Sequence, residues 1–79
     1  MVVKFKIDML YPQEAKWLGE IAGPQEYYLH TGFGGRGWNY RFDRTGYFLY
    51  IADEQIATMF LLKFGDKHRE LREDHDERV

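Results

Sequence analysis

Residues 26–64 read EYYLHTGFGGRGWNYRFDRTGYFLYIADEQIATMFLLKF, and this segment decides the fold of the chain. Its first part holds three short aromatic or apolar runs, which turn-forming segments at 32–37 and 43–46 separate. Such runs, bounded by glycine and aspartate, are typical of β-strands joined by tight turns. Its last part places apolar residues at helical spacing after Asp53, a favourable helix N-cap. The segment therefore predicts three strands followed by a helix.

The middle strand of this segment has aromatic residues at every second position. Trp38, Tyr40 and Phe42 alternate with polar residues along 38–43. Neighbouring side chains on a strand point to opposite faces, and burying an arginine without a partner is costly. We therefore expect these rings to face the core and Arg41 to face solvent. The glycines of 32–37 are expected to supply the positive φ angles of the preceding reversal.

The N-terminal part predicts one further strand and one further helix. Apolar residues occupy every second position of 3–9, which is the period of a half-buried strand. Pro12 suits the first turn of a helix, and apolar residues at 15, 18, 21 and 22 lie on one side of it. Gly23 and Pro24 end that helix.

The predicted element order is therefore β-α-β-β-β-α. Two helices with one apolar side each and a sheet that needs covering predict an α+β two-layer sandwich. We expect a four-stranded, mostly antiparallel sheet with both helices on one face, an arrangement of ferredoxin-like type. Residues 1–65 are expected to form this single domain. Residues 66–79 are mostly charged and predict a charged C-terminal tail.

Composition narrows the range of partners. Residues 1–65 hold seven basic and seven acidic residues, and the net charge of −2 comes from the tail. This balance disfavours non-specific binding to nucleic acid or to anionic membranes. The chain has no cysteine and no apolar run of membrane-spanning length, so we expect a cytoplasmic protein without a membrane partner.

Side chains that carry catalysis are scarce. The chain has no serine and no cysteine, and its carboxylates fall at expected surface, turn or cap positions. His68 and His75 share a helical face among acidic residues, but a metal site usually needs three or four positioned ligands. We therefore expect neither an enzyme, nor a metal site, nor a cofactor.

The glycines at 32, 34 and 37 form a G-x-G-x-x-G pattern, which in nucleotide-binding proteins lets backbone N–H groups approach a phosphate. In the dinucleotide-binding fingerprint a helix follows the glycines, whereas here a strand is expected. A hairpin turn is therefore the preferred interpretation. Binding of a phosphate or nucleotide by Gly34, Gly35 and Arg36 is kept as an alternative.

Residues 36–42, RGWNYRF, partly resemble the RNA-binding signature on the third strand of RNA-recognition-motif domains. In that family a basic residue, a glycine and alternating aromatic residues present rings on which bases stack. The resemblance implies a single-stranded RNA-binding domain of this type that uses Arg36, Trp38 and Tyr40. The positions between the rings depart from the family, because Asn39 and Arg41 would then point into the core.

Surface aromatic residues provide the leading functional prediction. Trp17, Tyr28, Tyr47 and Tyr50 exceed what the interior of so small a domain needs. Exposed aromatic patches and open sheet edges are typical of protein-binding surfaces. We expect a non-enzymatic module that acts by protein–protein contact, either with a host protein or with its own copy as a homodimer.

Residues 53–65, DEQIATMFLLKFG, preceded by the aromatic strand YFLYI, resemble short uncharacterised proteins of T4-like marine bacteriophages. The similar region runs from Tyr47 to Gly65. The resemblance implies a virus-encoded accessory factor that acts in a bacterial host cytoplasm, and it implies no catalytic residues.

Overall fold

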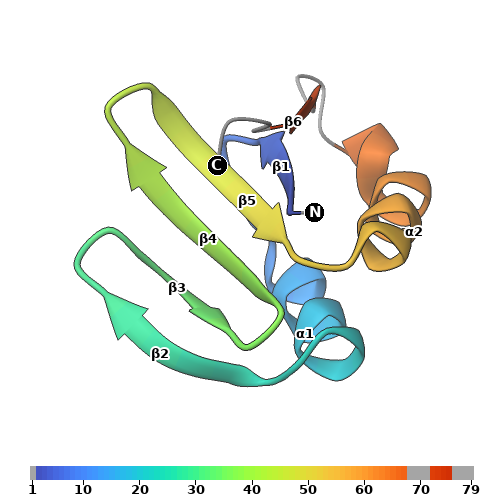
Figure 1. Ribbon diagram of the computed structural model, residues 1–79, viewed down its shortest axis with the longest axis horizontal. Helices are drawn as coiled ribbons and strands as arrows, with labels where there is room; N and C mark the ends of the chain where they lie inside the picture. Colours follow the sequence, from blue (N-terminus) through green and yellow to red (C-terminus); the bar gives the residue numbers. More distant parts are fainter. Residues whose placement is uncertain (1, 68–71, 76–79) are drawn as a thin grey trace.

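The computed structural model describes residues 2–67 and 72–75, which form one sheet and two α-helices (Figure 1). In chain order the elements are β1 (Val3–Lys6), α1 (Pro12–Ile21), β2 (Gln25–Leu29), β3 (Gly32–Gly35), β4 (Trp38–Asp43), β5 (Gly46–Ile51), α2 (Glu54–Phe64), the short 3-10 helix η1 (Gly65–Lys67) and β6 (Arg72–His75). The α+β class predicted from the sequence agrees with this structure.

The predicted number and order of strands are wrong, because the glycine-rich segment forms a strand of its own. β3 lies between β2 and β4 and pairs antiparallel with both. Five strands therefore come before α2 in the chain, where four were predicted. Glycine carries no side chain, so no alternation is visible in Gly-Phe-Gly-Gly and the segment reads as a turn. The positive φ angles that were expected there occur instead at Gly23 and Gly46.

The sheet has the strand order β2-β3-β4-β5-β1-β6, and its described pairs are antiparallel. α1 carries the chain from β1 to the far edge, and β2 to β5 then return as an uninterrupted meander. A ferredoxin-like sheet instead interleaves its helices with the strands as split β-α-β units. The ferredoxin-like assignment is therefore wrong. Within the C-terminal segment 66–79, β6 pairs with β1 and forms the second edge.

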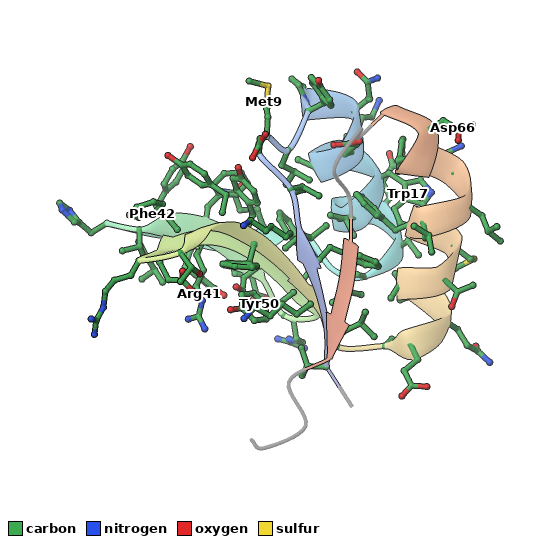
Figure 2. The ribbon with its side chains drawn as sticks, turned by 90° about the horizontal axis from the view of Figure 1, so that it is seen from above. Met9, Trp17, Arg41, Phe42, Tyr50 and Asp66 are labelled. Atoms are coloured by element: carbon green, nitrogen blue, oxygen red, sulfur yellow. The ribbon has the colours of Figure 1, made fainter. Side chains whose placement is uncertain are left out.

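One face of the sheet and both helices share a single hydrophobic core. The Phe5 ring on β1 contacts the Phe60 ring on α2 with centroids 5.8 Å apart. Trp17 of α1 lies between the helices, and its ring meets that of Phe64 edge-on at 5.7 Å (Figure 2). Leu18, Leu49 and Ile51 are fully buried in the same cluster. Burial of these apolar side chains is the main stabilising term of the fold.

The caps and turns show why the elements begin and end where they do. The Asp53 carboxylate accepts hydrogen bonds from the backbone N–H groups of Gln55 (2.8 Å) and Ile56 (3.4 Å), which confirms the predicted helix start. Pro12 occupies the first turn of α1. The Glu14 carboxylate on α1 accepts a hydrogen bond from the backbone N–H of Tyr11, which completes the helix cap, and Glu14 is fully buried.

The sheet extends beyond its helical cover. β2, β3 and the adjoining ends of β4 and β5 project away from α2 (Figure 1). Neither α1 nor α2 lies on the opposite face of the sheet, and Figure 2 shows Arg41 and Tyr50 on that side. Two surfaces of different chemistry are therefore left open. Neither helix in the described ranges has the length and apolar character that crossing a bilayer requires.

Candidate functional site

Five aromatic rings form a continuous row on the helix side of the projecting strands. We call this row the aromatic ladder, and its members, in order of contact, are Tyr28, Phe33, Tyr40, Tyr47 and Phe42. Successive ring centroids lie 5.7, 5.8, 5.7 and 5.0 Å apart. Rings at such distances gain stability beyond simple area burial. The ladder thus links edge strand β2 to β5 through the middle of the sheet.

The aromatic ladder borders a hollow of about 600 Å³. Its walls are the five rings of the ladder and the hairpin segment 29–32. Hollows of this size with mostly apolar walls hold small ligands or anchoring side chains of a partner. Tyr28, Phe42 and Tyr47 are 79%, 47% and 44% exposed, so apolar surface here remains in contact with water.

Phe42 corrects one prediction. It lies on the face that the alternation assigned to the core, because it follows the same parity as Trp38 and Tyr40 along β4. Its ring is nevertheless half exposed, since β4 projects beyond the helices at this end. Trp38 and Tyr40, at 3% and 9% exposure, are buried as the alternation predicted.

Hydrogen bonds fix the buried end of the ladder. The Tyr40 hydroxyl donates to the backbone carbonyl of Asp8 at 2.9 Å. Burial, assisted by Tyr47 and Asp8, raises the pKa of Tyr40 to about 12. The Trp38 indole N–H donates to the carbonyl of Gly23 at 2.7 Å. These bonds hold the strand in the orientation that turns both rings toward the helices.

The opposite face of the sheet combines cations with aromatic rings. Lys6 pairs with Phe48 and Lys4 pairs with Tyr50 across β1 and β5, and directly paired residues share a face. The same rule adds Arg41, which pairs with Phe48 across β4 and β5. We call these five residues the basic face.

Cations on the basic face lie directly over its rings. The Lys4 ammonium is 4.3 Å from the Phe48 ring centroid and 5.9 Å from that of Tyr50. The Arg41 guanidinium carbon is 4.7 Å from the Tyr50 centroid. Such cation–π contacts stabilise by about 0.5–1 kcal/mol each at exposed sites. Phe48 is buried, so Lys4 lies over a ring that is almost closed to water.

Within β1, β4 and β5, the carboxylate on this face lies at the end of β4. Asp43 shares the parity of Arg41, and its carboxylate accepts hydrogen bonds from the backbone N–H and the hydroxyl of Thr45, both at 2.7 Å. These bonds hold the pKa of Asp43 below its usual value. The paired positions of β1, β4 and β5 on this face therefore hold three cations and one carboxylate, and the register sets Arg72 and Asp74 of β6 beside Lys6 and Lys4.

The predicted partner-binding residues fall into three environments. Tyr28 and Tyr47 belong to the aromatic ladder and line the same hollow. Tyr50 lies on the basic face, on the other side of the sheet. Trp17 is half-buried between the helices, where its ring contacts Phe60 and Phe64. The structure thus brings two of the four together.

The residues predicted for RNA or phosphate contact do not form one surface. Trp38 and Tyr40 are both buried, and Tyr40 meets the hollow between Phe33 and Tyr47, so little of either ring is open to a base. Arg36 is exposed in the turn after β3 and lies 3.7 Å from a carboxylate oxygen of Glu26. Gly34 and Gly35 are buried within β3, and Gly34 pairs with strands on both sides. Its backbone is therefore engaged in the sheet and does not form a phosphate loop.

Two features of the site were missed from the sequence. Phe33 lies in a segment that was read as a turn, so its place in the ladder was not expected. The alternation over 3–9 predicts only that Lys4 and Lys6 face solvent. The register that sets them beside Tyr50 and Phe48 is not visible in the sequence. β1 and β5 pair although they lie far apart in the sequence, and local sequence patterns do not reveal such a pairing.

Within residues 2–67 and 72–75, no group of three or more histidine, aspartate or glutamate side chains lies close enough together to hold a metal ion. His68 lies outside the described residues.

Comparisons with known protein families, curated proteins and solved structures find no match for this chain. The resemblance of 47–65 to phage proteins therefore stays a prediction.

Proposed function

We propose that the protein is a non-enzymatic module that acts by protein contact, with a second copy of itself as the partner. The observation that carries this proposal is the aromatic ladder, which opens onto edge strand β2. Tyr28, the most exposed ring of the ladder, lies on that strand. Association through this edge would remove it from water.

β2 has the properties of a strand that accepts a neighbour. In the described part of the sheet it pairs only with β3, and its five residues are all exposed. Natural edges are usually protected by charges, proline or bulges. Here a register shift between Gln25 and Tyr27, together with Glu26, protects only the start of the strand. Tyr27, Tyr28 and Leu29 leave the rest unprotected.

The sequence of β2 is complementary to itself in one antiparallel register. If Tyr28 pairs with the partner's Tyr28 about a two-fold axis, Tyr27 falls opposite the partner's Leu29. Glu26 then falls opposite the partner's His30, so an acidic side chain faces an imidazole. Cross-strand aromatic and polar pairs of this kind stabilise by about 0.2–1 kcal/mol each. The two aromatic ladders would join into one row across the dimer.

Sedimentation equilibrium over a range of concentrations tests this proposal. We expect a reversible dimer for the unaltered chain and a monomer for Tyr28→Lys, because a lysine on the edge blocks strand addition. Leu62→Lys is the matched control, since Leu62 on α2 is 80% exposed and distant from β2. The control should still dimerise. A monomer at every concentration, or equal loss in both variants, would refute the proposal.

A further inference from the structure

We propose that the basic face binds single-stranded nucleic acid, with Tyr50 as the stacking ring and Lys4, Lys6 and Arg41 as the phosphate contacts. This surface lies on the opposite side of the sheet from the aromatic ladder (Figure 2). The proposal does not depend on dimer formation.

Positive charge is concentrated on the basic face. Residues 1–65 are neutral overall, with seven cations and seven carboxylates. Three of those cations lie on one sheet face, where Asp43 is the carboxylate among the paired positions of β1, β4 and β5, and the register sets Arg72 and Asp74 of β6 beside Lys6 and Lys4. Asp43 is engaged by Thr45 and lies at the end of β4. A patch with surplus positive charge attracts a polyanion even when the whole chain is neutral.

The Tyr50 ring lies between groups that suit a phosphate and groups that suit a base. In the register of the sheet, Lys4 lies beside it on β1 and Asn39 lies beside it on β4. Neighbouring strands are about 4.8 Å apart, so groups for phosphate and for base are within reach of the same nucleotide. Tyr50 is half-buried and keeps part of its surface open. The Arg41 guanidinium carbon lies 4.7 Å from the centroid of this ring, and aromatic rings and guanidinium planes are the two kinds of group on which unstacked bases stack.

Asn39 adds an unused polar group beside the ring. Its side-chain oxygen is buried and has no hydrogen-bond partner among the described residues. Buried polar atoms in native proteins are nearly always paired, so an orphan atom calls for an explanation. A base stacked on Tyr50 would bring donors to the neighbourhood of this amide, and a small rotation would let the oxygen accept one.

A single strand fits this face better than a duplex. Bases must be unstacked to lie on a protein ring, and single strands offer them without the cost of melting. The proposal differs from the RNA-binding arrangement expected from the sequence, since Trp38 and Tyr40 point to the other side. The same sheet thus presents different aromatic residues to solvent from those that the motif indicated.

Fluorescence anisotropy with short labelled oligonucleotides tests the proposal. The probes are oligo-uridine RNA, oligo-thymidine DNA, a duplex of equal length and poly-glutamate. We expect binding to one or both single strands and weaker binding to the duplex and the peptide. With three phosphate contacts, the affinity should fall roughly 20-fold between 50 and 200 mM salt, at a slope of about 0.7 per contact.

Variants on the two sides of the sheet separate a site from general charge attraction. Arg41→Gln should weaken binding and lower the salt slope by about 0.7. Lys16→Gln, at an exposed position of α1, removes the same charge from the helix side of the sheet and should leave binding unchanged. Tyr50→Leu should weaken binding about fivefold or more, with circular dichroism confirming the fold. Equal effects of Arg41→Gln and Lys16→Gln, binding as tight to poly-glutamate, or no binding to either single strand would each overturn the proposal.

Discussion

The rings of Tyr40 and Tyr47 stack with their centroids 5.7 Å apart and their planes inclined by only 11°. Tyr40 is anchored in the core by its bond to Asp8, whereas Tyr47 faces the open hollow. The pair therefore connects the rigid interior of the sheet with its exposed aromatic surface. A surface ring held in this way loses little conformational entropy when a partner covers it.

Removing the Tyr40 hydroxyl tests the anchor. Tyr40→Phe keeps the ring and its stacking but loses the hydrogen bond to the Asp8 carbonyl. We expect a loss of about 1 kcal/mol in the free energy of unfolding, measured by urea denaturation. Tyr28→Phe, on the exposed edge strand, is the control and should change stability by less than about 0.5 kcal/mol. Equal losses would show that the bond to Asp8 contributes nothing particular.

The same residue predicts a loss of stability at high pH. The pKa of Tyr40 is about 12 in the folded state against an ordinary value of 10.0, because burial disfavours the phenolate. Above pH 10 the unfolded chain releases this proton first, so stability falls as pH rises from 10 toward 12. Urea midpoints across this range should fall more for the unaltered chain than for Tyr40→Phe. Parallel curves would contradict the assignment.

Close backbone approach makes Gly34 sensitive to substitution. A Cβ there would lie 2.4 Å from the Cβ of Asn39 and 2.6 Å from the carbonyl oxygen of Trp38. Gly34→Ala should therefore cost about 1–3 kcal/mol or more by thermal or urea unfolding. Gly19→Ala is the matched control, because a Cβ there meets only Pro24, at 3.9 Å. In helix α1 it should stabilise by about 0.5–1 kcal/mol. A tolerated Gly34→Ala would argue against β3 as a tightly flanked strand.

The cap of α2 gives a prediction about helix stability. Asp53→Ala removes the acceptor for the N–H groups of Gln55 and Ile56 and should cost about 1 kcal/mol of unfolding free energy. Asp53→Asn retains an acceptor oxygen and should lose much less. If both variants lost the same amount, the effect would come from the charge at the helix start and not from the hydrogen bonds.

The parts of the fold that the sequence predicted are those with local signals. The strand predicted from the alternation over 3–9, which the structure has at Val3–Lys6, the buried rings of Trp38 and Tyr40, and the helix that Asp53 begins all follow from short-range periodicity or capping. β3 was missed because glycine hides the alternation of a strand. With that strand unseen, neither the strand count nor the topology was correct.

The surfaces were harder to predict because they depend on where the helices stop and on which strands pair. Phe42 and Leu61 fit the apolar periods of β4 and α2, yet both are exposed because the described neighbouring elements leave them partly open to water. Tyr28 and Tyr47 were expected at a surface, but only the ring contacts of Phe33 and Tyr40 between them join the two into one ladder. Likewise, only the pairing of β1 with β5 sets Lys4 beside Tyr50.

The most direct test of self-association through β2 is disulfide trapping between Tyr27→Cys and Leu29→Cys chains. The natural chain has no cysteine, so each variant carries one thiol, and Tyr28 stays in place. In the proposed register these two positions face each other, with Cα atoms about 4.5–5.5 Å apart, which suits a disulfide. On mild oxidation of a mixture, analysed by mass spectrometry, we predict mainly the mixed Tyr27→Cys/Leu29→Cys dimer, and none with Gln13→Cys on α1. A statistical distribution of dimers, or no dimers, would contradict the proposed pairing.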